Sequence, residues 1–226
     1  MPLTTDLRDD VASAFESLVG RTPDGLWSAP GVVPLAGGRL VAVNRRTVVA
    51  LGARDDSTLR IASLPDDELA ELPLADVATV DAVGWLATAL DAVRALGADL
   101  GAVPGIDLVL ESTVPDVLGA DAALAAAITV ALADVWRVET AVPDSGAPAP
   151  ETLLVVDTDD ADLAIETLIE VGASHVHAFA GGVSAVIDPD SVSRAQVSID
   201  GAFAEHGLGQ PEMLVVESSA GALRER

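Results

Sequence analysis

Residues 112–136 have the arrangement of a phosphate-binding loop. An apolar strand runs up to Pro115, a short loop follows, and an alanine-rich helix is predicted over residues 121–136. Backbone N–H groups at the start of a helix attract phosphate, because they lack partners within the helix and lie at the positive end of its dipole. The pattern therefore indicates a place where a phosphate group could dock.

The side chains of this loop argue against phosphate transfer. The loop contains Asp116 and Asp121 but only one glycine, Gly119. Two like charges 4 Å apart cost about 4 kcal/mol at an effective dielectric constant of 20, so a carboxylate here would repel a phosphate. We predict that Asp121 caps the helix and takes the N–H groups that a phosphate would use. In the alternative interpretation, Asp116 or Asp121 holds Mg²⁺ and restores binding.

Two α+β regions are predicted, joined by a proline-rich linker at residues 141–150. The second region has the strand–helix–strand–strand–helix–strand order of a ferredoxin-like fold, with a hairpin at Gly181 and Gly182. We therefore expect lobes at residues 1–140 and 151–226. In the first lobe the expected helices are 5–19, 80–96 and 121–136, the strands are 39–44, 47–53, 58–64 and 105–113, the hairpin turns are 45–46 and 55–57, and 65–78 is a polar connection.

The composition restricts the classes of partner. The net charge is −24, all twelve basic residues are arginine, and there is no cysteine. Such acidity fits a halophilic cytoplasm, where the Debye length is about 3 Å. We expect a cytoplasmic protein that binds neither nucleic acid nor membrane, because a basic patch, a signal peptide and a long apolar stretch are all missing. His175 and His177 have no third ligand placed by spacing, so no metal site is expected.

The order of motifs along the chain resembles galactokinase and the GHMP kinase superfamily. SAPGVVPLAGG at residues 28–38 is similar to the first motif, residues 46–63 to the hairpin after it, and GIDLVLESTVP to the strand before the second motif. Residues 184–207 and 213–222 are similar to the closing region. The resemblance covers most of residues 26–136 and 170–223. It implies a two-lobed α+β fold, with a ribosomal-S5-domain-2-like amino-terminal lobe and a ferredoxin-like carboxyl-terminal lobe.

The resemblance also implies where remnants of the family's sites lie. The nucleotide-loop remnant is Pro115, Gly119, Ala120 and Asp121, the sugar-site remnant is Gly37, Gly38 and Arg39, and the third-motif remnant is Gly181 and Gly182. The departures are substantial. Val32, Pro34 and Gly38 replace the family's Arg, Asn and sugar-binding Glu, and the second motif has lost its serines. The interval that carries the family's catalytic Asp is reduced to the linker, so no position carries the base.

These departures predict a non-catalytic, galactokinase-like pseudokinase that binds a sugar or another small molecule, or acts as a regulatory module. The first alternative is an active sugar kinase that uses ATP and Mg²⁺, with Glu111, Asp116 or Asp121 as base. The second is a structural, homodimerising protein without a ligand. The missing middle segment would leave an apolar face of the carboxyl-terminal sheet exposed, unless the lobes pack tightly or the protein dimerises. Self-association is therefore expected.

Overall fold

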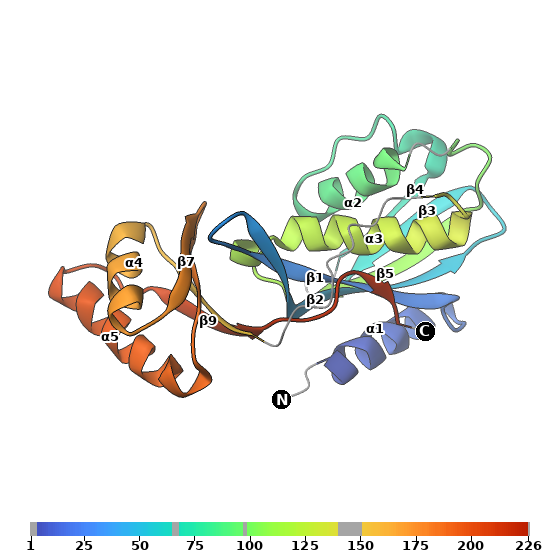
Figure 1. Cartoon of the computed structure of the whole chain (residues 1–226). Helices are drawn as coiled ribbons and strands as arrows, with labels where there is room; N and C mark the ends of the chain where they lie inside the picture. Colours follow the sequence, from blue (N-terminus) through green and yellow to red (C-terminus); the bar gives the residue numbers. More distant parts are fainter. Residues whose placement is uncertain (1–3, 65–67, 97–98, 140–150, 226) are drawn as a thin grey trace. The chain divides into compact units, whose positions relative to one another are not determined.

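The computed structural model describes residues 4–64, 68–96, 99–139 and 151–225, so the predicted linker at 141–150 lies outside the described residues. The mixed α+β architecture with two sheets confirms the predicted fold class (Figure 1). The chain divides into two compact units. Unit 1 comprises residues 1–31, 45–144 and 221–226, and unit 2 comprises residues 32–44 and 145–220. No helix in the described residues is both long enough and apolar enough to cross a membrane.

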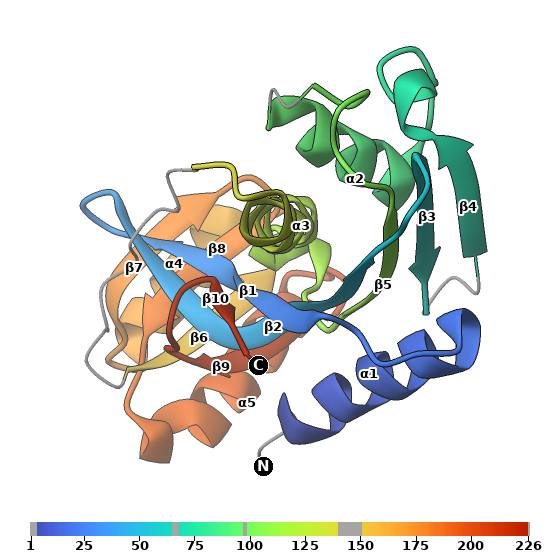
Figure 2. The same cartoon turned by 90° about the vertical axis from the view of Figure 1, so that its right-hand side faces the viewer.

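Unit 1 contains a mixed sheet in the order β10-β1-β2-β5-β3-β4. β3 and β5 run parallel, whereas β2 and β5 run antiparallel. Helix α1 covers one face of this sheet, and α2 and α3 cover the other (Figure 2). The elements are α1 Thr4–Val19, β1 Gly25–Leu35, β2 Arg39–Ala53, β3 Thr58–Ser63, β4 Glu68–Pro73, α2 Gly84–Ala95, β5 Ile106–Ser112, α3 Ala120–Trp136 and β10 Leu223–Arg224.

Alternation along β5 divides the apolar side chains of unit 1 between two cores. Leu108 and Leu110 pack with α2 and α3, whereas Val109 packs with the side chains of α1. Successive side chains of a strand point to opposite faces, so odd and even positions of β5 meet different helices. This alternation decides on which face each polar residue of β5 lies.

The structure corrects several predictions for the first lobe. β2 is one continuous strand, so Arg45 and Arg46 are not a turn, and the side chain of Arg46 is buried. β5 lies between β2 and β3 in the sheet, so residues 55–57 do not close a hairpin. The connection predicted at residues 65–78 contains the edge strand β4, and α2 begins at Gly84 and not at residue 80. Strand β1 was not predicted from the sequence. The predicted turns were wrong because burial in a sheet overrides the local preference of polar residues for turns.

Unit 2 has the predicted ferredoxin-like order. Its four strands are antiparallel and lie in the order β7-β8-β6-β9. Helices α4 and α5 cover one face of the sheet (Figure 1), and apolar residues of β6 such as Leu154 and Val156 pack beneath them. The elements are β6 Thr152–Asp157, α4 Ala161–Glu170, β7 Ser174–Phe179, β8 Gly182–Val186, α5 Val192–Glu205 and β9 Glu212–Glu217.

Residues 32–44, the end of the β1–β2 hairpin, lie against the other face of the unit 2 sheet. Ser184 Oγ donates a hydrogen bond to Pro34 O, and Ser184 stands opposite Val155 in the β6–β8 register. Leu153 and Val155, which point away from α4 and α5, are fully buried. The apolar face that would favour self-association is therefore covered by the chain itself. Self-association stays a prediction.

Candidate functional site

The loop between β5 and α3 was predicted to bind phosphate, and its backbone leads directly into the start of a helix. A 3-10 turn over Asp116–Leu118 follows Pro115, and Gly119 then precedes α3 as its N-cap residue in the left-handed conformation, with φ of 75°. Gly119, the N-cap residue, has no side chain that could accept a hydrogen bond from the first N–H groups of this helix. The first N–H groups of α3 are thus left to water or to a ligand.

The prediction that Asp121 caps this helix is wrong. The helix begins at Ala120, one residue earlier than predicted, so Asp121 lies inside the first turn. Its Oδ1 accepts a hydrogen bond from Thr88 Oγ1 of α2 at 2.9 Å, and its side chain is exposed. Asp121 therefore does not fill the space in front of the N–H groups, although its negative charge remains close to them.

Gly31 supports this loop from behind. A Cβ atom on Gly31 would lie 2.8 Å from Val114 Cγ1 and 3.0 Å from Leu118 O. Only a residue without a side chain allows β1 to approach the loop so closely. Gly31 belongs to the SAPG sequence at residues 28–31, so the start of this motif has a structural role here.

The three candidate bases do not lie together. Asp116 and Asp121 flank Gly119 on the loop, and both are exposed. Glu111 lies on β5 directly after Leu110, which faces α2 and α3, so Glu111 points to the α1 face. Burial raises the pKa of Glu111, and the nearby negative charge of Asp10 on α1 raises it further. Glu111 is thus separated by the sheet from α3.

No group of three potential metal-ligating side chains occurs among the described residues.

The other two remnants lie in unit 2. Gly37 and Gly38 have φ of 83° and 76° and form the turn between β1 and β2. Arg39 begins β2, and its guanidinium donates to Glu151 Oε2 at 2.8 Å. Gly181 and Gly182 form the predicted β7–β8 turn. Arg39 is therefore already engaged by a carboxylate, and the turn glycines fulfil a backbone requirement.

Comparison with known proteins agrees with this architecture. No family model matches the chain. Over 136 residues the chain is 35% identical to the galactokinase of Streptomyces coelicolor. This alignment covers 54% of this chain and 34% of that galactokinase. The chain thus spans about a third of the length of that galactokinase. The crystal structure of Lactococcus lactis galactokinase with galactose matches with a TM-score of 0.77 at 10% identity, over 95% of this chain and 99% of that one.

A second solved structure extends the comparison. Mevalonate kinase from Methanococcus jannaschii matches with a TM-score of 0.62 at 9% identity, over 86% of this chain and 98% of that chain. The chain is galactokinase-like and has the GHMP kinase fold. The predicted resemblance is therefore confirmed. At such low identity the solved structures establish the fold alone.

The loop between β5 and α3 has no basic side chain of its own. The sequence contains no arginine between Arg94 and Arg137, and it contains no lysine at all. Phosphoryl transfer depends on positioning and on neutralising charge at the transferred group. The loop therefore offers N–H groups to a phosphate but no cation from its own residues.

Sequence reasoning missed a buried polar cluster close to this loop. Arg46 is only 6% exposed, and its Nε donates to Ser28 Oγ at 2.9 Å. Its Nη2 donates to Gly221 O at 2.8 Å, and the carboxylate of Glu225 lies 3.9 Å from Nε. Glu225 also pairs with Arg8 of α1 at 2.8 Å. Residues from both ends of the sequence meet here, so no local pattern could reveal the cluster.

A second ion cluster surrounds Asp107, at the opposite end of β5 from the loop. Arg54 Nη1 lies 2.7 Å from Asp107 Oδ1, and Arg21 and Arg60 approach the same carboxylate within 3.6 Å. The hydrogen bonds that Arg54 donates to the carboxylates of Asp56 and Asp107 raise the pKa of Arg54. Three guanidinium groups therefore share one buried carboxylate, which makes it a stability element of unit 1.

Unit 2 contains a hollow of about 420 Å³ between the end of β6 and the segment after α5, and no residue of the β5–α3 loop lines it. Its lining includes Asp157, Asp159, Phe203 and Leu208. Asp160, also at this hollow, caps α4 by accepting from the N–H of Leu163 at 3.1 Å.

Proposed function

We propose that the protein is a galactokinase-like binding protein that docks the phosphate groups of a nucleotide at the start of α3 without transferring them. The observation that carries the proposal is the uncapped helix start at Gly119. Free N–H groups at the positive end of a helix dipole favour an anion. The close packing of Gly31 against residues 114 and 118 supports a loop that is held in shape before the ligand arrives.

The side chains of the loop favour binding without transfer. Asp116 and Asp121 put two negative charges beside the helix start, and residues 113–136 include no basic side chain. Binding should therefore require Mg²⁺, because the ion would offset the repulsion between carboxylates and phosphates. The candidate base Glu111 faces α1 and so cannot accept a proton beside α3.

A sugar is the second candidate ligand. Support comes from the galactokinase of Lactococcus lactis, which was crystallised with galactose and shares this fold. Against this, Gly38 replaces the sugar-binding Glu that the family resemblance implies, and Arg39 is paired with Glu151. We therefore expect weaker binding of galactose than of nucleotide.

Calorimetric titration in about 2 M KCl tests the proposal. Mg-ATP and Mg-ADP should bind, galactose should not trigger ADP release, and EDTA should abolish nucleotide binding. Gly119→Ala should weaken binding, because an L residue at φ of 75° costs about 1–2 kcal/mol. Gly207→Ala is the matched control, because Gly207 has φ of 70° in unit 2, and it should bind like the wild type.

Two results would reject the proposal. Galactose-dependent release of ADP would identify an active sugar kinase and refute the non-catalytic assignment. The absence of heat with every nucleotide and sugar, together with a stable dimer, would instead favour a structural protein.

A further inference from the structure

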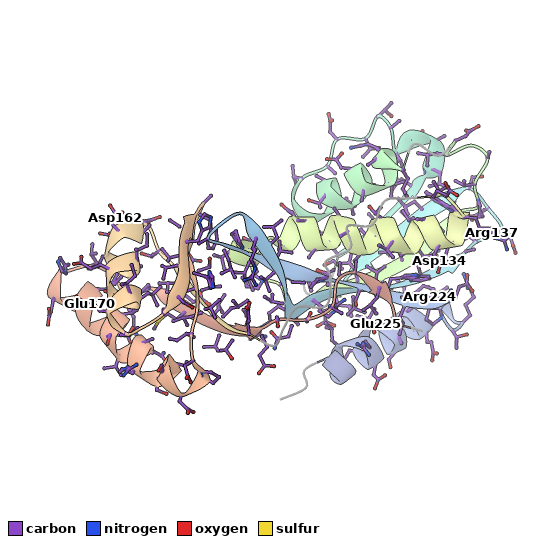
Figure 3. All side chains as sticks on the ribbon, viewed as in Figure 1. Asp134, Arg137, Asp162, Glu170, Arg224 and Glu225 are labelled. Atoms are coloured by element: carbon purple, nitrogen blue, oxygen red, sulfur yellow. The ribbon has the colours of Figure 1, made fainter. Side chains whose placement is uncertain are left out.

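Residues 221–225, here called the clasp, belong to unit 1 although they follow all of unit 2 in the sequence. Leu223 and Arg224 form β10, which pairs antiparallel with Ser28 and Trp27 of β1. Arg224 Nη1 lies 3.0 Å from Asp134 Oδ2 of α3, and its guanidinium stacks over the ring of Trp27 at 5.3 Å. Figure 3 shows Arg224 and Glu225 of the clasp with Asp134.

The inner contact of the clasp is the buried side chain of Arg46. The clasp supplies Gly221 O and the carboxylate of Glu225, and β1 supplies both Oγ and O of Ser28. Glu225 has only 5% of its side chain exposed, so the charges of Arg46 and Glu225 are removed from water together. A buried charge that loses its partner is strongly destabilised, so the position of Arg46 depends on the clasp.

The backbone of Arg46 holds the first residue of the phosphate loop. Its N–H donates to Thr113 Oγ1 at 3.1 Å, and its carbonyl accepts from the N–H of Thr113 at 3.0 Å. Thr113 directly follows β5 and precedes Val114, the residue that packs on Gly31. Arg46 therefore contacts the clasp through its side chain and the loop through its backbone.

We propose that Arg46 is a positioning residue for the loop at residues 113–119, and that the clasp controls this loop through Arg46. With the clasp docked, the guanidinium is held and the N–H and C=O of Arg46 fix Thr113. With the clasp displaced, the guanidinium loses Gly221 O and the carboxylate of Glu225, and the hold of Arg46 on Thr113 loosens. The effect of the clasp on ligand binding rests on the proposed nucleotide function, but the coupling between the clasp and residues 113–119 through Arg46 does not.

Amide hydrogen exchange on the full chain tests the link directly. Glu225→Gln keeps the size of the side chain and removes its charge, and it should speed exchange in residues 113–119 by about tenfold or more. Glu225→Asp restores the charge and should return exchange towards the wild-type rate. Glu212→Gln makes the same change at an exposed position of β9 and should have no effect on the loop.

The pattern of exchange decides the outcome. Faster exchange in the clasp and β1 with an unchanged loop would overturn the proposal, and so would a uniform increase that includes β3 and β4. If Glu225→Gln does not fold, Arg46→Lys replaces it: this variant keeps the charge, loses the forked contacts and should still loosen the loop. Mg-ADP affinity is measured in parallel. A wild type that binds no nucleotide would reject the proposed function and leave the exchange result intact.

Discussion

Gly31→Ala tests whether close packing of β1 shapes the phosphate loop. The new Cβ would lie 2.8 Å from Val114 Cγ1, whereas carbon atoms normally approach to about 3.5 Å. Val114 is β-branched and stiff, and the second close atom is a backbone oxygen of Leu118, so neither can easily yield. Overpacking of this kind costs about 1–3 kcal/mol. For a chain of this size, each kcal/mol lowers Tm by about 2–4 °C.

Tryptophan fluorescence during urea unfolding in molar KCl is the assay, because Trp27, Trp85 and Trp136 all belong to unit 1. Gly201→Ala in α5 of unit 2 is the control, since nothing lies within 4 Å of its new Cβ. The control should leave the tryptophan transition unchanged and stabilise α5 by about 0.5–1 kcal/mol. A Gly31→Ala variant as stable as the wild type, with unchanged nucleotide affinity, would refute the reasoning.

Two further variants probe charges of unit 1. Asp107→Asn should lower the unfolding free energy by about 3 kcal/mol in urea melts, because the guanidinium groups around it lose their shared carboxylate; an unchanged midpoint would contradict this. Glu111→Gln should stabilise the protein at pH 7.5, because the raised pKa of Glu111 means that its charged form destabilises the folded state. This stabilisation should vanish near pH 3.5, below the unfolded pKa of about 4.3, and a larger gain at low pH would refute the sign.

The sequence predicted unit 2 more completely than unit 1. In unit 2 each strand and helix has its own period, and Asp160 caps α4 where local capping preferences place it. In unit 1 the pair Arg45 and Arg46 was expected to form a turn, because charged residues rarely occupy a buried strand. The partner that makes burial of Arg46 acceptable is Glu225, at the far end of the sequence. Local patterns contain no information about such a partner.

The connection between β5 and α3 lies where the sequence predicted it, but the start of α3 was predicted wrongly. Aspartate favours helix starts, so Asp121 was assigned to the cap. The structure instead begins α3 at Ala120, because Gly119 is the N-cap residue and its left-handed conformation brings the chain into the helix one residue earlier than predicted. The hydroxyl of Thr88 then holds the carboxylate of Asp121 to one side, a contact between two helices that sequence alone does not place.

The pairing of β1 with β10 has a consequence for biosynthesis. Ser28 and Glu225, which bond across this junction, are separated by 197 positions. While the chain is being made, one edge of β1 stays without its neighbour until β2 to β9 have been synthesised. Bare strand edges recruit other strands, so nascent molecules are exposed to misassembly during this interval. Such long-range closure also predicts slow maturation, because distant segments must meet before the native pairing is reached.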